Sequence, residues 1–251
     1  MTKRWIALVT VSLLFLSILA QPVAPQEVIP VPVVCLDPGH GGADPGATNG
    51  DLQEKEINLD VAYKVKELLE ADGYSVVMTR SDDSNPTNEE RYTTANSAGA
   101  SVLVSIHTNS VLKNADTVDG SMALYFKTDD MALAQIMREE LYANLRGTAE
   151  GEGIVFRDFG LEKFAARILM SSNMPATIAE PVCMSHLQEA IWLSTQVFSD
   201  LGNVVNPDCV DCRRAKIAKS IHGAIVLYLE QGAPGDDNRG GPPCDSPPCG
   251  K

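Results

Sequence analysis

The sequence predicts a single α/β domain: a twisted, mostly parallel or mixed sheet with helices on both faces. Three observations support this fold class. Strand-type and helix-type segments alternate along the chain, which is typical of sheets covered on both sides. The 251 residues can form one sizeable core. Hydrophobic residues make up 44% of the chain, whereas aromatic residues make up only 6%, so that core is mainly aliphatic.

The elements follow from hydrophobic spacing and from the residues that end each run. Ile57, Val61 and Val65 recur at helical spacing and Gly73 ends that run, which predicts an amphipathic helix over 54–72. Asn88 is expected to cap the next helix. The predicted strands are 33–40, 75–80, 102–107, 120–126 and 176–180. The predicted helices are 54–72, 88–99, about 130–145, 188–201 and about 213–229, with a glycine-rich passage at 147–153.

The two ends of the chain differ from the middle. Lys3 and Arg4 precede an apolar stretch from Trp5 to Ala20, the pattern of a secretory signal peptide. The stretch is also nearly long enough for a membrane anchor, so retention as an anchor stays open. We therefore predict a signal peptide or anchor over 1–20, a Pro-rich linker over 21–32, one domain over 33–231 and a disordered Gly/Pro-rich tail over 232–251.

Charge and cysteine content restrict the partners and the compartment. The formal net charge of −13 argues against a partner bound through its phosphates, so no nucleic acid is expected, and membrane contact is expected only through 1–20. Export would place six cysteines where disulfides form. Cys35 is expected to be buried in a strand, and Cys183 is not expected to be a nucleophile. Disulfides are expected among Cys209, Cys212, Cys244 and Cys249.

Three strand ends carry the residues that suggest chemistry. His40 and His107 each end a predicted strand, and Glu180 ends a third. The carboxyl ends of parallel strands share one rim, so these side chains are expected to meet there. Two imidazoles with an acidic side chain are typical of a catalytic zinc site. The third ligand is left open between Glu54, Glu56 and another histidine, and Glu180 is the candidate general base.

Several separated motifs in one order carry a family resemblance. They are Leu36–Gly42, Asp44–Ala47, Glu54–Leu59, Ser105–Asn109, and Met174-Pro175 leading to Glu180. Together they resemble the zinc-dependent N-acetylmuramoyl-L-alanine amidases of the amidase-3 family. The resemblance implies one zinc ion held by His40, Glu54 and His107, with Glu180 as general acid/base. It further implies that residues 33–231 form an exported catalytic domain, periplasmic or secreted to the cell wall, whose substrate is the amide between N-acetylmuramic acid and L-alanine in peptidoglycan.

Two other functions fit the same residues and stay open. A zinc-bound water can attack many amides, so a different zinc amidohydrolase or peptidase on the same scaffold is one alternative. A non-catalytic wall-binding protein that keeps the fold is the other. Whether a protein activator is needed is not indicated by the sequence.

Overall fold

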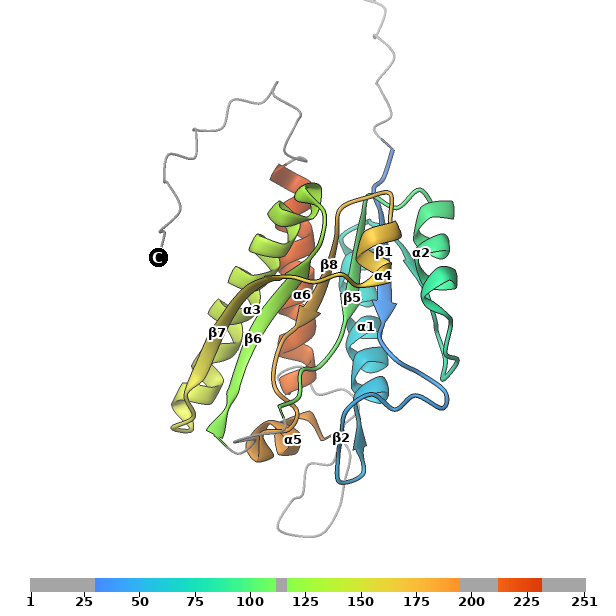
Figure 1. Cartoon of the computed structure of the whole chain (residues 1–251). Helices are drawn as coiled ribbons and strands as arrows, with labels where there is room; N and C mark the ends of the chain where they lie inside the picture. Colours follow the sequence, from blue (N-terminus) through green and yellow to red (C-terminus); the bar gives the residue numbers. More distant parts are fainter. Residues whose placement is uncertain (1–29, 112–116, 195–211, 232–251) are drawn as a thin grey trace, which may run out of the picture. The chain divides into compact units, whose positions relative to one another are not determined.

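A computed structural model describes residues 30–111, 117–194 and 212–231. The chain divides into two units, 1–30 and 31–251, and the second contains the strands and helices of the described ranges. Its centre is a six-stranded sheet in the order β4-β1-β5-β8-β6-β7 (Figure 1). Neighbours from β4 to β8 are parallel, β6 is antiparallel to β8, and β7 is parallel to β6. The sheet is therefore mixed, as predicted.

The strands that end at the rim are short and buried. The sheet strands are β1 (Val33–Pro38), β4 (Ser75–Met78), β5 (Val102–Ile106), β6 (Asp119–Tyr125), β7 (Phe156–Lys163) and β8 (Ala176–Glu180). A small hairpin, β2 (Thr48–Asn49) and β3 (Leu52–Gln53), lies beside the rim. In the register, Pro38 pairs with Ile106, and Ile106 pairs with Ala179. The residues that follow β1 and β5 and the last residue of β8 therefore lie at one edge.

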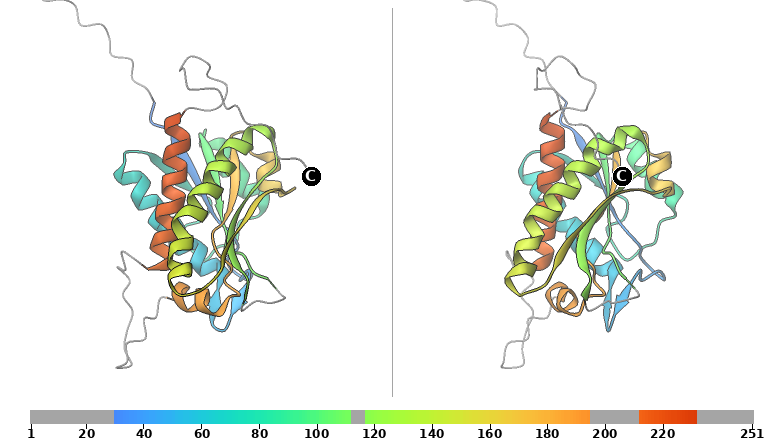
Figure 2. Two further views of the ribbon diagram at one scale, coloured as in Figure 1. Left: turned by 90° about the vertical axis from the view of Figure 1, so that its left-hand side faces the viewer. Right: turned by 60° about the vertical axis from the view of Figure 1, so that its left-hand side comes forward.

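Helices cover both faces of the sheet, and alternating strand residues divide the core between the faces. One face packs against α1 (Glu54–Ala71), α3 (Met131–Gly151) and α6 (Arg213–Gln231), which lie together in Figure 2. The other packs against α2 (Asn88–Ser97) and α4 (Arg167–Ser171). Leu36 and Val104 face the first group, whereas Cys35 and Leu103 face the second. Cys35 is buried, as expected.

Several elements differ from the prediction, and neither α4 nor the β2–β3 hairpin was predicted. The cap of α2 is Thr87, not Asn88: the Thr87 side chain accepts from the Glu90 N–H and Glu90 caps in return. α3 continues through the glycine-rich passage to Gly151, since a helix with one buried stripe tolerates isolated glycines. β7 was not predicted because its burial does not alternate: only Phe156 is buried and most other positions are exposed, as on an edge strand.

Several predictions fall on residues outside the described ranges. The signal peptide or anchor, most of the linker, the tail, and three of the four cysteines expected to form disulfides belong to this group. The predicted helix at 188–201 is shorter in the structure: α5 spans Leu187–Leu193 and ends before Ser194, whose backbone is extended. Residues 195–201 lie outside the described ranges. None of the helices in the described ranges is both long and apolar enough to cross a membrane.

Candidate active site

The turn after β1 presents the first histidine in a strained conformation. His40 has φ 62°, and no other non-glycine residue in the described ranges has a positive φ. Such a conformation costs free energy unless surrounding groups impose it. The preceding Gly39 is packed so closely that an added Cβ would lie 2.3 Å from Cε1 of His107. The turn therefore brings the two histidines together only because residue 39 lacks a side chain.

Two buried arginines fix this turn. Arg80 donates from Nη2 to the Gly39 carbonyl at 2.9 Å, and Arg91 donates from Nη2 to the His40 carbonyl at 2.9 Å. Both also donate to the carbonyl of Pro38. Asp37 accepts from Arg91 at 2.8 Å. We did not predict this role from sequence; the available signal was the pair of arginines beside predicted strand and helix ends.

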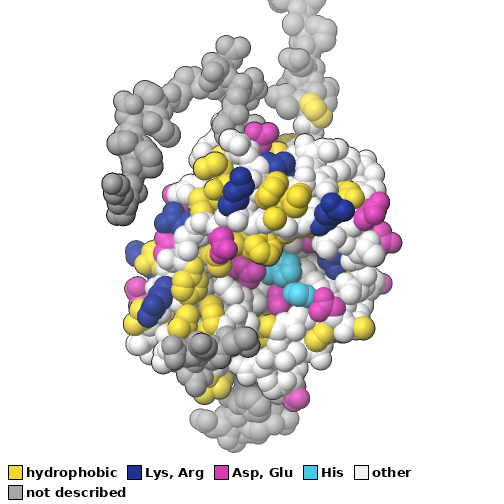
Figure 3. Space-filling view, viewed as in Figure 1, with side chains coloured by type: hydrophobic (Ala, Val, Ile, Leu, Met, Phe, Trp, Pro, Cys, Tyr) yellow, Lys and Arg dark blue, Asp and Glu magenta, His cyan; other side chains and the backbone are white. Residues whose placement is uncertain are grey.

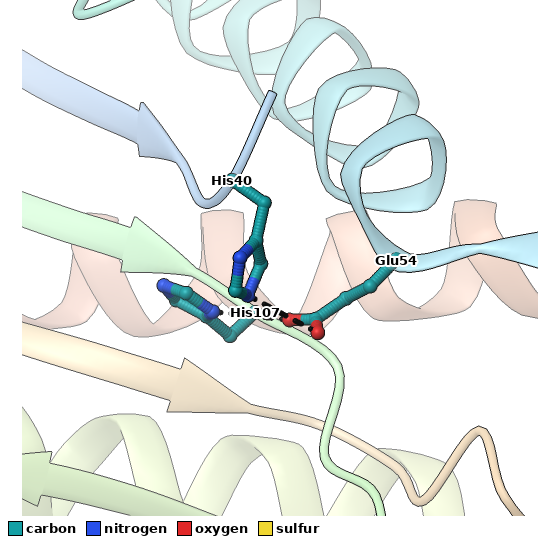
Figure 4. A group of neighbouring side chains, drawn as sticks. All are labelled: His40, Glu54 and His107. Carbon is teal, nitrogen blue, oxygen red and sulfur yellow. Dashed lines mark hydrogen bonds and ion pairs between the residues drawn. The ribbon is translucent and has the colours of Figure 1, made fainter. Parts of the chain in front are cut away.

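The second histidine and a glutamate complete a three-residue group. His107 follows β5, and Glu54 is the first residue of α1. His40 Nε2 lies 3.2 Å from Glu54 Oε2, and His107 Nδ1 lies 3.0 Å from Glu54 Oε1. Figure 4 shows the three side chains pointing toward one another from separate elements. One ligand atom from each lies within 4.8 Å of the others, so the group could hold a metal ion.

The carboxylate is held by groups that the sequence reasoning missed. Glu54 accepts from the N–H of Ala47 at 2.9 Å and from the N–H of Thr108 at 3.1 Å. Asn58, one helical turn after Glu54, donates to it at 3.3 Å and accepts from the Thr108 hydroxyl at 3.0 Å. An asparagine in the buried stripe of α1 was the sequence signal for this support.

The pKa shifts follow from these contacts. Burial opposes ionisation of Glu54, but hydrogen bonds with His107 and His40 hold its pKa well below the usual range. Hydrogen bonding to Glu54 raises the pKa of His40 to about 9 against the effect of burial. Burial would lower the pKa of His107, yet Glu54 and Glu180 together raise it. In the protein without metal, a positive charge is therefore favoured at the centre of the group.

Glu180 lies beside the group but outside it. Its strand neighbour in register is Met122 of β6, and the His107 N–H donates to the carbonyl of Ala179 next to it. Its Oε2 is buried, with no hydrogen-bond partner among the residues that the structure describes. Burial raises the pKa of Glu180 to about 7; His107 opposes this shift and Glu54 adds to it.

The remaining candidate residues are elsewhere. Glu56 is exposed on α1, whereas Glu54 is buried. His222 bonds Asp72 at 2.7 Å, and His186 is buried but does not belong to the three-residue group. Cys183 is buried, and burial raises the pKa of its thiol to about 12, which disfavours a thiolate nucleophile.

A pocket of ≈ 460 Å³ opens beside the histidines. Its lining includes His40, His107 and residues around the start of α2, and also Phe164, Ala166, Ile168 and Ile178 of β8. Figure 3 shows the histidine side chains at the edge of this hollow. A substrate can therefore reach the imidazoles from solvent.

Fold and site define a class: an α/β scaffold whose sheet rim carries the side chains of a metal-dependent hydrolase. Residues 34–203 match the family described as N-acetylmuramoyl-L-alanine amidase, and the chain belongs to this family. It is a peptidoglycan amidase of the cell-wall hydrolase type, which implies action outside the cytoplasm. The resemblance read from the motifs is confirmed.

Relatives agree with this assignment. The N-acetylmuramoyl-L-alanine amidase LytC of Bacillus subtilis is 33% identical over 199 residues, which cover 78% of this chain and 35% of LytC. The AmiC2 amidase of Nostoc punctiforme has a TM-score of 0.65 and 28% identity, over 79% of this chain and 97% of AmiC2. The CwlD amidase of Clostridioides difficile, solved in complex with the GerS lipoprotein, has a TM-score of 0.64 and 26% identity, over 80% of this chain and 99% of CwlD.

Proposed function

We propose that this chain hydrolyses the amide between N-acetylmuramic acid and L-alanine with one zinc ion held by His40, Glu54 and His107, and with Glu180 as the general acid/base. The observation that supports this most strongly is the convergence of the three donors beside Glu180, whose Oε2 has no hydrogen-bond partner within the described part of the chain.

The donor set fits zinc. Two imidazole nitrogens and one carboxylate oxygen are a common catalytic set, with a further position left for water. Without metal, each histidine faces a Glu54 oxygen at 3.0–3.2 Å, and this contact favours positive charge between them. A divalent cation would replace that charge. The bonds from Asn58 and the two N–H groups orient the carboxylate, as outer partners of metal ligands commonly do.

The proton transfers are assigned to Glu180. Zinc, when bound, supplies a polarised amide carbonyl and an acidified water. Glu180 would take a proton from the attacking water as the water oxygen bonds to the acyl carbon. It then gives the proton to the amide nitrogen as the carbon–nitrogen bond breaks, which releases an amine and a carboxylic acid. In the protein without metal, burial raises the pKa of Glu180 above its usual range, which favours a carboxylate that accepts a proton.

The site of action follows from the substrate. Peptidoglycan lies outside the cytoplasmic membrane, and we propose that residues 1–20 direct export to the periplasm or the cell wall. Peptidoglycan is the partner that this reaction requires.

A matched pair of variants tests the ligand assignment. Glu54→Gln removes the charge of a ligand oxygen and is expected to lower zinc content sharply, whereas Glu56→Gln is expected to keep it. Metal analysis of the purified full chain gives the result. Equal zinc in both variants would remove Glu54 from the site.

Glu180→Gln tests the proton-transfer role. The amide keeps the shape but cannot carry the proton, so turnover of purified peptidoglycan is expected to fall by about 10²–10⁴-fold with zinc content unchanged. New amino groups on L-alanine identify the amidase reaction in the parent; new amino groups on glucosamine would instead indicate a deacetylase. Near-parent turnover by the zinc-loaded variant would make Glu180 structural.

A further inference from the structure

A single asparagine on α1 is completely buried beside the three-residue group. Asn58 Nδ2 donates to Glu54 Oε1 at 3.3 Å and to the carbonyl of Gly39 at 3.4 Å. Asn58 Oδ1 accepts from the Thr108 hydroxyl at 3.0 Å. A buried amide is costly unless its donors and its acceptor are used, and here both ends of the amide are used inside the fold.

The three partners of this amide belong to the three segments that carry the proposed zinc ligands. Glu54 is itself a proposed ligand, Gly39 precedes His40, and Thr108 follows His107. These segments are the start of α1, the turn after β1 and the loop after β5. One rigid side chain therefore joins every segment on which the donor set depends.

We infer that Asn58 is a positioning residue that sets the spacing of the three ligand-bearing segments, and thereby the affinity of the site for its metal ion. This inference rests on the proposed function. Donors that are held in place before binding give a higher affinity, because the ion does not have to order them. Asn58 is not a ligand itself; it acts through the residues that it joins.

Asn58 also limits how the Glu54 carboxylate can bind an ion. Apart from the histidine contacts, Oε1 accepts from the Asn58 amide and from the Thr108 N–H at 3.1 Å. Oε2 accepts from the Ala47 N–H at 2.9 Å. Each carboxylate oxygen has about two lone-pair positions, so Oε1 is occupied and Oε2 keeps one position for a cation. Without Asn58, Oε1 regains a position, and a cation can contact both oxygens instead of one.

Zinc titration and the visible spectrum of the cobalt(II)-substituted full chain test this role. Asn58→Ala is expected to raise the Kd for zinc about 10–100-fold, as loss of an outer partner of a ligand commonly does. The d–d absorption of bound cobalt(II) is expected to weaken, because contact with both carboxylate oxygens raises the coordination number.

The matched control is Asn96→Ala on α2. Asn96 donates to the carbonyl of Ser171 at 3.1 Å and accepts from the N–H of Asn173 at 2.8 Å, so it also joins distant segments, but none of them carries a proposed ligand. This variant should lower the free energy of unfolding and keep the parent's zinc Kd and cobalt spectrum.

A second pair of variants tests the same contact if Asn58→Ala does not fold. Thr108→Val removes the hydroxyl that binds Asn58 but keeps the backbone N–H that binds Glu54. It is expected to raise the Kd for zinc about tenfold. Thr108→Ser returns the hydroxyl and is expected to recover most of the lost affinity.

The outcomes separate this inference from the proposed function. If Asn58→Ala and Thr108→Val are less stable but bind zinc within about twofold of the parent, with an unchanged cobalt spectrum, Asn58 is only structural and the inference is overturned. An equal loss of zinc affinity in Asn96→Ala would overturn it as well. If the parent chain binds neither zinc nor cobalt(II), the proposed function itself fails, and the inference fails with it.

Discussion

Two clusters of buried charge stabilise different halves of the sheet. The cluster under the β1 turn has two arginines and one acid, and the cluster between β6, α5 and α6 has one arginine and two acids. Their members are Arg80, Arg91 and Asp37 in the first, and Arg213, Asp119 and Glu189 in the second. In the second, Arg213 forms an ion pair with Glu189 and lies over the rings of Phe156 and Trp192 at 5.5 and 5.4 Å.

The difference lies in where the hydrogen bonds go. In the first cluster the extra donors bind backbone carbonyls of the site turn, so every group is satisfied while charged. In the second, Asp119 Oδ2 has no hydrogen-bond partner within the described part of the chain and faces Glu189. Burial raises the pKa of Glu189 to about 8; Arg213 opposes this shift and Asp119 adds to it. The first cluster thus orders a site, whereas the second responds to pH.

The largest expected effect is at Arg91. Arg91→Gln leaves the buried Asp37 with only the Thr79 and Ser105 hydroxyls as donors and no paired charge. It also frees the His40 carbonyl, so the free energy of unfolding should fall by about 3–5 kcal/mol. Zinc affinity should fall as well, because His40 is no longer held. Urea unfolding and zinc titration measure both, with the exposed Arg157→Gln as control. Unchanged zinc affinity would show that the turn keeps its conformation without the Arg91 hydrogen bonds.

Removal of zinc should also lower the stability of the domain. At free zinc of 100 times Kd, binding adds about 2.7 kcal/mol to the free energy of unfolding, and a chelator removes it. The domain should stay folded, because the arginine bonds to the turn do not involve metal. Urea unfolding monitored by circular dichroism, with and without chelator, gives the difference. If the domain unfolds on chelation, the Arg80 and Arg91 hydrogen bonds are not sufficient to hold the turn without metal.

The second cluster predicts a pH dependence. Because the folded-state pKa of Glu189 is raised above its unfolded value, the folded chain binds the extra proton, and stability falls as pH rises from about 4.5 to about 8. Each pH unit that separates the folded-state pKa from the unfolded-state pKa is worth about 1.4 kcal/mol. Glu189→Gln should flatten that part of the curve, as measured by urea unfolding between pH 5 and 8. If the variant shows the same slope of unfolding free energy against pH, the extra proton of the folded state is bound by a group other than Glu189.

The smallest effect concerns the helix that carries Arg91. Thr87→Ala removes the cap of α2 and should lower the free energy of unfolding by about 1 kcal/mol, with little change in zinc affinity. Asn88→Ala, at the residue predicted from sequence to be the cap, should change stability far less. A comparison of the two by thermal unfolding decides which residue caps the helix.

The elements and site residues that depend on spacing along the chain could be predicted from the sequence. Those that depend on contacts between distant segments could not. The α1 stripe, the strand ends with His40 and His107, and the mixed sheet were predicted because each depends on neighbours along the chain. β7 was missed because an edge strand needs burial on only one side. The choice of Glu54 over Glu56 came from the family motif alone, since both begin the same helix. Arg80 and Asn58 were missed because their partners are distant in sequence.

The backbone at His40 has a consequence for how this chain can change over time. Glycine adopts a positive φ without strain, so His40→Gly relaxes the turn while it removes a nitrogen of the proposed zinc site. Backbone strain and activity are therefore opposed at this position. In a descendant freed from selection for catalysis, glycine at position 40 would relieve the strained φ but would leave the buried Glu54 carboxylate with one imidazole neighbour fewer, so the arginine-bound turn and the buried acid would change separately.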